Sequence, residues 1–490
     1  MKLGELVARL PDAATQPDPQ IEVRDVVYDS RKVGAGSLFV AIRGLATDGN
    51  LYVDAARKKG AVVVVSEQAP RPGGPWVQVK DARRALAMLA SAMLGDPASA
   101  LALVGVTGTN GKTTTSYLID AALRAAGMTV GLLGTVQYRL GARVAEAVRT
   151  TPEASDLQAL FLEMKDAGCT HAVLEVSSHS LELKRVHGLD FQVAVFTNLT
   201  RDHLDFHGDM DNYFAAKRCL FDTLLRTDGH AILNADDDRT AELARVSRGR
   251  VSTYSVGRRP ADLRAEEVSL GLHGTRFAVA SPEGRFEIES PLLGRFNVAN
   301  LLAAFGAALA LKVPPPLAIA GLASISGVPG RLERVQVGQD FTVIVDYAHT
   351  DDALKNLLET MRDLKPRRLI TVFGCGGDRD RTKRPLMGAV AARLSDLVVL
   401  TSDNPRSEPP EAILEEIQRG MPAGRGAERQ VVVDRREAIA LAIEMAGPGD
   451  AVVIAGKGHE PYQVLRDRSV PFDDRQVARE ALSRLARSGK

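Results

Sequence analysis

The sequence predicts an α/β protein of three domains, and three observations support this. The chain has 490 residues, more than a single hydrophobic core usually holds, so several domains are expected. Apolar runs of strand length alternate with helical patterns, which is typical of parallel sheets covered by helices. A glycine-rich segment lies between one such run and the helical pattern after it, where phosphate-binding loops occur.

The composition is that of a globular protein without a strong charge bias. Hydrophobic residues make up 45% and charged residues 25% of the chain, as in ordinary globular folds. The chain has 62 lysines and arginines and 61 aspartates and glutamates, so bulk charge gives no attraction for nucleic acid. Aromatic residues are 5%, which disfavours base-stacking surfaces. We therefore expect no nucleic-acid partner.

The cysteines and the apolar runs indicate a cytoplasmic protein. Cys169, Cys219 and Cys375 show no ligand or disulfide spacing, as expected in a reducing compartment. The first residues contain no apolar run of signal-peptide length. The longest apolar stretch, residues 301–311, is about half a membrane span. We expect a cytoplasmic location and no membrane insertion.

The first predicted domain covers residues 1–98 and carries short strand-like runs. These runs lie at residues 21–28, 38–42 and 61–65. A helical pattern over residues 82–94 follows, and Gly95-Asp96-Pro97 ends it.

The second predicted domain covers residues 99–330 and opens with an apolar run over 101–106, a buried parallel strand. Further strand-like runs alternate with helical patterns, at residues 171–176, 191–198 and 231–234. Residues 262–290 are expected to add hairpin strands. A helix over residues 297–311 ends before three prolines.

The third predicted domain covers residues 331–490 and alternates in the same way. Its strand-like runs lie at residues 342–346, 369–373, 397–401, 430–433 and 451–455, each followed by a helical pattern. This pattern predicts a second α/β unit of Rossmann-like character.

The strongest local motif is GVTGTNGKTT, residues 105–114. It follows a buried strand and precedes a helical pattern over residues 114–126, which is the context of a phosphate-binding loop. Lys112 is expected to reach the β- and γ-phosphates, and the Thr113 hydroxyl to bind Mg²⁺. Val106 stands where the strict pattern has glycine, so the loop is a variant, and a plain glycine-rich turn is the alternative. The motif alone leaves motor, kinase, GTPase and ligase open, although no guanine signature is present.

Four further residues come into consideration for the same site. Glu175 ends an apolar run, where it either caps a strand or binds Mg²⁺ through hard oxygen atoms. His203 and His207 have i, i+4 spacing, but Leu204 replaces the glutamate of a zinc motif, so a histidine beside the phosphates is favoured over zinc. From the residues alone, Lys217 is more simply an amphipathic lysine of a helix.

Three polar loops follow strands of the third domain, and they should therefore cluster. They are Gly374–Asp380, Asp403–Arg406 and Gly456–Glu460. Arg379 and Arg406 provide guanidinium groups that bind carboxylates, and Glu460 provides an acceptor for an ammonium group. Together these side chains suit an amino-acid-like ligand, whereas solvation of ordinary loops is the alternative.

The chain resembles the Mur ligase family from Tyr28-Asp-Ser-Arg31 to Glu460. The segments that carry the resemblance are GVTGTNGKTT, EVSSHSLELKR, TNLTRDHLDFHGDMDNYFAAK, GRFNVANLLAA, GVPGRLE, VDYAHT, FGCGGDRDRTKRPLMG, DNPR and AGKGHE. The resemblance implies a three-domain architecture with a central P-loop ATPase domain and a C-terminal Rossmann-like domain. It is closest to the branch that adds the third residue of the peptidoglycan stem.

The implied reaction is an ADP-forming amide ligation in cytoplasmic peptidoglycan precursor synthesis. ATP phosphorylates the D-Glu γ-carboxylate of UDP-MurNAc-L-Ala-D-Glu, and the amine of meso-diaminopimelate attacks the acyl phosphate. ATP and Mg²⁺ are the implied cofactors, and a monomer is expected. The alternatives are the same ligation with L-lysine or another diamino acid, and a P-loop sensor that binds a cell-wall precursor without ligating it.

The resemblance also implies roles for individual residues. The implied catalytic residues are Lys112, His203 and Lys217. The implied ATP contacts are Gly108, Thr109, Asn110, Gly111, Lys112, Thr113, Thr114, Asn297, Arg331 and Asp346. The implied contacts to UDP-muramoyl-dipeptide are Ser30, Thr150, Thr151, Ser177 and Arg185. The implied diaminopimelate contacts are Arg379, Asp403, Asn404, Pro405, Arg406, Gly456 and Glu460. The implied metal ligands are Thr113, Glu175, His203 and Lys217, the last as a carbamate.

Arg406 sets the expected choice of amino acid. DNPR is the pattern of family members that add meso-diaminopimelate, because the guanidinium group pairs with the distal carboxylate. The chain departs from the family pattern at three positions. Asp351 replaces a proline after AHT, Leu183 replaces a polar residue, and Leu45 lies on the uracil side.

Overall fold

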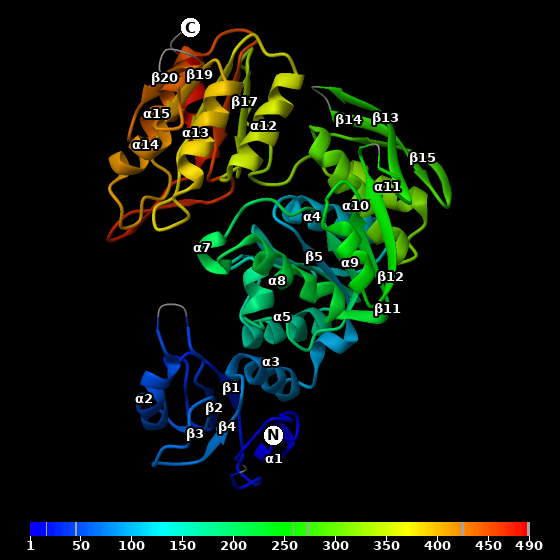
Figure 1. Ribbon diagram of the computed structural model, residues 1–490, viewed down its shortest axis with the longest axis vertical. Coiled ribbons are helices and arrows are strands. Elements are labelled where there is room, and N and C mark those ends of the chain that lie inside the picture. Colours follow the sequence, from blue (N-terminus) through cyan, green and yellow to red (C-terminus); the bar gives the residue numbers. More distant parts are fainter. Residues whose placement is uncertain (16, 45–46, 258, 272–273, 423–425, 488–490) are drawn as a thin grey trace.

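Three sheet-containing units follow one another along the long axis of the molecule (Figure 1). The computed structural model describes residues 1–15, 17–44, 47–257, 259–271, 274–422 and 426–487, so Leu45 lies outside the described residues. The N-terminal unit lies at one end, the C-terminal unit at the other, and the central unit between them (Figure 1). The α/β fold class is therefore confirmed. The domain boundaries at residues 98 and 330 stay a prediction.

The N-terminal unit is a small parallel sheet with its core against one long helix. The sheet has the order β1-β2-β3-β4, with bounds β1 Asp25–Val27, β2 Ser37–Val40, β3 Ala61–Ser66 and β4 Trp76–Gln78. Its helices are α1 Leu3–Val7, α2 Val53–Lys58 and α3 Ala82–Met93. Asp81 caps α3 by accepting hydrogen bonds from two backbone N–H groups. Because α3 also contacts α5 (Ala154–Asp166), it joins this unit to the central one.

The central unit is a mixed sheet of order β15-β14-β13-β12-β11-β10-β5-β9-β6-β7-β8. Its middle strands are parallel, and antiparallel strands extend both ends. The bounds are β5 Ala102–Thr107, β6 Val130–Leu133, β7 Gln137–Leu140, β8 Arg143–Glu146, β9 His171–Glu175, β10 Phe191–Phe196, β11 Leu225–Asn234, β12 Arg250–Ser255, β13 Leu263–Gly271, β14 Gly274–Ser281 and β15 Gly284–Ser290. The expected hairpin strands over residues 262–290 are confirmed.

Helices cover both faces of the central sheet, which buries its strands on two sides. One face packs against α4 Lys112–Ala125, α10 Arg295–Ala310 and α11 Pro315–Ser324. The other face packs against α5, α6 Ser178–Glu182 and α8 Met210–Asp222. The short helices α7 Leu204–His207 and α9 Thr240–Val246 complete this unit. The predicted helices over 114–126 and 297–311 correspond to α4 and α10, each of which begins two residues earlier.

The C-terminal unit is a six-stranded sheet of order β16-β17-β21-β18-β19-β20. Its strands are β16 Glu333–Arg334, β17 Thr342–Asp346, β18 Leu369–Phe373, β19 Leu397–Leu400, β20 Glu428–Val431 and β21 Ala451–Ala455, with a separate hairpin of β22 Tyr462–Val464 and β23 Ser469–Pro471. One face carries α12 Asp351–Asp363, α13 Lys383–Leu394 and α14 Pro410–Gln418, and the other α15 Arg435–Met445 and α16 Asp474–Arg487. The strand predicted at 430–433 begins two residues earlier in the structure. The prediction missed this start because β20 is a mostly exposed edge strand, whose apolar pattern is weak.

The described residues contain no helix that is long and apolar enough to cross a membrane.

Candidate functional site

The glycine-rich loop joins β5 to α4 at the centre of the parallel part of the sheet. Gly108 has φ +146° and Gly111 has φ +86°, conformations that favour glycine. A Cβ atom at Gly108 would lie 1.9 Å from Thr197 Oγ1, so no other residue fits there. Within the described residues no side chain caps the start of α4, so its first backbone N–H groups can bind an anion.

Two lysines from different helices meet at the carbonyl of Gly108. Lys112 Nζ donates to Gly108 O (2.9 Å) and Thr109 O (2.8 Å). Lys217, on α8, donates to the same Gly108 O at 2.8 Å, and its Nζ lies 4.4 Å from the centre of the Tyr213 ring. Burial lowers the pKa of Lys112. Burial and the nearby Lys112 hold the pKa of Lys217 well below its usual range.

Glu175 ends β9 beside the loop, and uncharged donors surround its carboxylate. Oε2 accepts from Thr113 Oγ1 (2.9 Å) and Thr135 Oγ1 (3.0 Å), and Oε1 accepts from Thr135 N (2.8 Å). The side chain is 1% exposed. Thr135 was not a sequence candidate, because nothing in its local pattern marks it. A buried carboxylate with hydroxyl neighbours and no lysine or arginine ion pair in the described chain is a suitable Mg²⁺ ligand.

His203 lies at the start of α7, next to the same loop. Its Nε2 is 3.4 Å from Asp202 Oδ2, and its ring is 4.7 Å from that of His179. The His207 ring lies 5.5 Å from that of His179, and its Nε2 is 3.0 Å from Ser178 Oγ. Among the described residues, no group of three or more His, Cys, Asp or Glu side chains forms a metal cluster.

Three predicted nucleotide contacts approach the loop from other elements. Arg331 Nη2 donates to Thr113 Oγ1 at 3.2 Å. Asp346, at the end of β17, accepts from Leu332 N (2.7 Å) and Ala348 N (2.8 Å), and burial raises its pKa. Asn297, on α10, accepts from Asn300 Nδ2 at 2.9 Å.

These parts surround a cavity of about 470 Å³ between the central and C-terminal units. The predicted residues that line it are Thr109, Asn110, Gly111, Lys112, Thr113, Thr114, Thr150, Glu175, Ser177, His203, Asn297, Arg331 and Asp346. The structure thus brings together most of the predicted ATP and metal residues. Gly108 and Lys217 lie directly behind the lining, and the predicted amino-acid contacts lie outside it.

The predicted contacts to UDP-muramoyl-dipeptide fall into two groups. Thr151 Oγ1 donates to Glu175 O (2.8 Å) and lies 3.3 Å from Ser177 Oγ. Arg185 donates to Thr151 O (3.1 Å) and pairs with the buried Glu153 (2.8 Å). Ser30 follows β1 in the N-terminal unit, and its carbonyl accepts from Lys59 Nζ at 3.0 Å. The structure therefore groups Thr150, Thr151, Ser177 and Arg185, but places Ser30 outside this group.

Two arginines of the C-terminal loops form no ion pair within the described chain. Arg406 Nη1 donates to Gly377 O at 2.7 Å, and Arg379 Nη1 donates to Asp378 O at 2.9 Å. Burial and the nearby Arg379 lower the pKa of Arg406. Arg406 has φ +52°, an uncommon conformation outside glycine, and its N–H donates to Val464 O at 3.1 Å.

Glu460 lies in the same region with three donors around it. Oε2 accepts from Asn404 Nδ2 (2.9 Å) and from Lys457 Nζ (3.1 Å), and Oε1 accepts from the Tyr347 hydroxyl (3.3 Å). Lys457 Nζ also donates to Asn404 Oδ1 at 3.0 Å. Lys457 is fully buried and was not a sequence candidate, although it lies within the AGKGHE segment.

The ends of β19 and β21 approach closely at this point. A Cβ atom at Gly456 would lie 2.5 Å from Asp403 Oδ2, so the glycine permits the approach. The Pro405 carbonyl accepts from Glu408 N at 3.1 Å. The predicted amino-acid residues are therefore contiguous, as their positions at the carboxyl ends of parallel strands predict.

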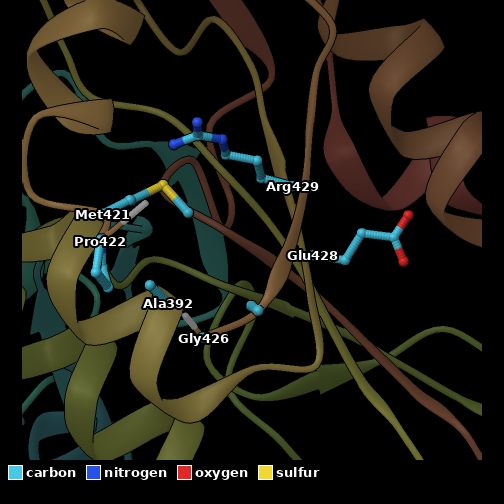
Figure 2. A pocket seen from close by; sticks show the side chains of 7 residues that line it. Ala392, Met421, Pro422, Gly426, Glu428 and Arg429 are labelled. Carbon is cyan, nitrogen blue, oxygen red and sulfur yellow. The ribbon is translucent and has the colours of Figure 1, made fainter. Parts of the chain in front are cut away.

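A second hollow, of about 310 Å³, lies elsewhere on the C-terminal unit. Figure 2 shows the side chains of Met421 and Pro422 beside it, with Glu428 and Arg429 directed to different sides. None of the predicted site residues lines this hollow.

Comparisons with known proteins agree with this arrangement. Three protein-family models match the chain: "Mur ligase family, catalytic domain" over residues 22–94, "Mur ligase middle domain" over residues 106–308, and "Mur ligase, glutamate ligase domain" over residues 330–458. The chain is 50% identical over 487 residues to the UDP-N-acetylmuramoyl-L-alanyl-D-glutamate–2,6-diaminopimelate ligase of Solibacter usitatus, covering 98% of each chain. It is 46% identical over 485 residues to the protein of the same name from Syntrophomonas wolfei, covering 98% of this chain and 99% of that one.

A solved structure of a ligase with that name superimposes with a TM-score of 0.71 at 35% identity, covering 99% of both chains. The MurF ligase of Thermotoga maritima, solved with ADP, has the same fold at 19% identity, with a TM-score of 0.62 over 94% of this chain and 97% of that one. The chain therefore belongs to the Mur ligase family, which confirms the resemblance found in the sequence.

Proposed function

We propose that the protein is an ATP-dependent ligase that joins meso-diaminopimelate to UDP-MurNAc-L-Ala-D-Glu in cytoplasmic peptidoglycan precursor synthesis. The names of the relatives support this choice of substrates. The observation that carries the proposal is the pair Arg379 and Arg406, two guanidinium groups without a carboxylate partner in the described chain, in the same loop region as Glu460. A monomer is part of the same proposal.

ATP is the proposed phosphoryl donor, and the loop from Gly108 to Thr114 supports it. The backbone N–H groups at the start of α4 and the Lys112 ammonium group are suited to phosphate oxygens. Asn297, Arg331 and Asp346 are the proposed further nucleotide contacts. The γ-carboxylate of D-Glu would attack the γ-phosphorus, and ADP would leave.

The residues present fit Mg²⁺. Glu175 and the Thr113 hydroxyl supply adjacent hard oxygen atoms, and Mg²⁺ is usually held by one or two carboxylates together with substrate phosphates. Glu175, Thr113 and His203 would hold the ion, directly or through water. Its positive charge would offset the charge of the phosphates.

The amine of diaminopimelate would then attack the carbonyl carbon of the acyl phosphate, and phosphate would leave as the amide forms. The protein's contribution is to hold amine and acyl phosphate together and to stabilise negative charge near Lys112. Thr150, Thr151, Ser177, Arg185 and the more distant Ser30 are the proposed contacts to the UDP-muramoyl-dipeptide.

A carbamate on Lys217 is supported by its surroundings. Burial and the neighbouring Lys112 favour the neutral amine, which is the form that attacks CO₂ and releases a proton. The resulting anion would pair with Lys112 and bind a cation, whereas an ammonium group would repel both.

The amino-acid pocket favours a ligand with an additional carboxylate. Arg384, by comparison, pairs with both Glu408 (2.8 Å) and Glu416 (2.8 Å), so its positive charge is already matched by carboxylates of the chain. Arg406 and Arg379 instead donate to backbone carbonyls. A distal carboxylate would satisfy the Arg406 guanidinium group, whereas the ammonium group of lysine would be repelled.

The test is release of phosphate from ATP and Mg²⁺ with UDP-MurNAc-L-Ala-D-Glu, with and without meso-diaminopimelate. We expect release that depends on both substrates. Phosphate release with lysine and not with diaminopimelate would overturn the choice of amino acid but not the ligase assignment. No release with any amino acid would favour the non-ligating sensor.

Arg406→Ala should raise the KM for diaminopimelate about 100-fold, because a charge-assisted contact of ~3 kcal/mol is lost. The KM for ATP should change less than twofold. The matched control is Arg381→Ala, which removes an exposed arginine paired with Glu416. Efficient use of lysine by the wild type, or an unchanged KM in Arg406→Ala, would contradict the assignment.

A further inference from the structure

Tyr347 connects two parts of the site that are remote in the sequence. It directly follows β17, and its side chain is half-buried. The hydroxyl donates to Glu460 Oε1 at 3.3 Å. Because Oε2 of the same carboxylate accepts from Asn404 and Lys457, the Tyr347 contact fixes the remaining oxygen atom.

The ring of Tyr347 contacts the nucleotide side of the site. The Arg331 guanidinium carbon lies 4.4 Å from the ring centre, a distance at which a cation attracts an aromatic ring. The same guanidinium group donates to Thr113 Oγ1 at 3.2 Å. Three consecutive contacts therefore lead from Glu460 through Tyr347 and Arg331 to the phosphate-binding loop.

The backbone around this path is closely packed. A Cβ atom at Gly458 would lie 2.8 Å from Tyr347 Cβ, and one at Gly330 would lie 2.1 Å from His459 N. The segments that carry Arg331, Tyr347 and Glu460 therefore touch one another through backbone atoms. A shift of one segment must displace the others, because close-packed interiors transmit such shifts.

We infer that Tyr347 is a positioning residue that couples amino-acid binding to nucleotide binding, an inference that rests on the proposed function. Nucleotide phosphates would hold Arg331 in place, Arg331 would fix the ring, and the hydroxyl would orient Glu460 toward the ammonium group of the amino acid. A bound nucleotide thus increases the affinity for diaminopimelate, and the reverse effect has the same size.

The first measurement is calorimetric binding of meso-diaminopimelate to the full-length protein saturated with UDP-MurNAc-L-Ala-D-Glu. Binding is compared with and without Mg²⁺ and a non-hydrolysable ATP analogue. For the wild type we expect about fivefold or more tighter binding with the analogue. Turnover with diaminopimelate is measured on the same preparation, which tests the proposed function separately.

Tyr347→Phe removes the hydroxyl and keeps the ring against Arg331. We expect the analogue to change diaminopimelate affinity less than twofold in this variant. The KM for diaminopimelate should rise about tenfold, the loss of one hydrogen bond to a charged group, with the KM for ATP unchanged. Tyr347→Leu also removes the ring, so both KM values should rise.

The matched control is Tyr462→Phe. Tyr462 lies near the same pocket, with the centre of its ring 5.7 Å from Lys457 Nζ. Its hydroxyl has no hydrogen-bond partner within the described residues. In Tyr462→Phe, the ATP analogue should increase the affinity for diaminopimelate as much as in the wild type. An active wild type without coupling, or unchanged coupling in Tyr347→Phe, would overturn the inference and leave the proposed function intact. A wild type without diaminopimelate-dependent turnover would overturn both.

Discussion

At the scale of single residues, the structure gives Lys217 an environment that its sequence pattern does not reveal. It lies on an amphipathic helix, where a lysine normally reaches solvent. Its side chain is instead 1% exposed and donates to Gly108 O, beside Lys112. No carboxylate of the described chain forms an ion pair with it. Such a buried cation is costly unless it is neutral or modified.

Lys217→Ala should reduce kcat about 100-fold or more, equivalent to ~3 kcal/mol of lost transition-state stabilisation. Short carboxylates such as formate or acetate should restore part of the activity, because they supply the missing anion. The measurement is phosphate release at increasing carboxylate concentration.

Lys217→Arg is the matched control for this rescue. A guanidinium group keeps the positive charge, does not form the carbamate and occupies the space, so carboxylates should not restore activity. Full activity of Lys217→Ala without added carboxylate would contradict the proposal that Lys217 carries a carbamate.

At the scale of secondary-structure elements, a buried ion pair holds the strand ends of the amino-acid pocket. Arg435, the first residue of α15, pairs with Asp474, the first residue of α16, at 2.6 Å, and both side chains are fully buried. Arg435 also donates to Ala455 O (3.0 Å) and Ser402 O (3.4 Å). These carbonyls directly precede Gly456 and Asp403, so the pair supports the pocket from behind.

Asp474→Asn should destabilise the C-terminal unit by about 3–5 kcal/mol, because it leaves a buried guanidinium group without its counter-charge. The expected fall in the first thermal unfolding midpoint is on the order of 10 °C, measured by scanning calorimetry. Glu480→Gln is the control, since it removes an exposed partner of Arg436 and should cost at most ~1 kcal/mol. Equal midpoints for the two variants would contradict this role.

At the scale of the whole molecule, polar contacts join the C-terminal unit to the nucleotide loop. Asp352, on α12, accepts from Asn110 Nδ2 at 2.9 Å. Its neighbour Asp351 pairs with Arg201 of the central unit at 2.8 Å, and Arg201 also donates to Thr382 Oγ1 at 2.8 Å. Asp351 is the first residue of α12, where the family pattern has proline. The Thr350 side chain caps this helix, so the helix start does not depend on a proline. Asp351 instead adds an ion pair between the two units.

Asp351→Asn should weaken the contact between the C-terminal and central units beside the nucleotide loop and raise the KM for ATP about two- to fivefold, as expected for a partly exposed pair of ~0.5–1 kcal/mol. The radius of gyration with a non-hydrolysable ATP analogue, measured by small-angle scattering, should increase slightly. Asp228→Asn, which breaks an exposed pair within the central unit, is the control.

The combined exchange Arg201→Asp with Asp351→Arg tests the pair directly. Only partial restoration of the ATP KM is expected, because Arg201 also pairs with Asp380 at 3.7 Å, and high salt should reduce all of these differences. A KM that is the same in wild type and Asp351→Asn at low salt would contradict a role for the pair.

Much of the fold could be predicted because it depends on local pattern. Strands buried on both faces, such as β5 and β18, read as continuous apolar runs, and α10 ends before a run of prolines. Edge strands gave weaker signals, as β20 shows. The helix α4 began at Lys112, earlier than its apolar pattern suggests, because its first turn serves the phosphate loop.

The α/β class, the family and the short motifs of the site can be read from the amino-acid sequence. These features depend on residues that are adjacent in the chain, such as the glycines and Lys112 of the phosphate loop. Which side chains meet is visible only in the folded protein: Thr135 meets Glu175, Lys457 meets Asn404 and Glu460, and Tyr347 meets Arg331. The physical reason is that hydrogen bonds and ion pairs act over a few ångströms, and only folding brings residues separated by tens to hundreds of positions within that range.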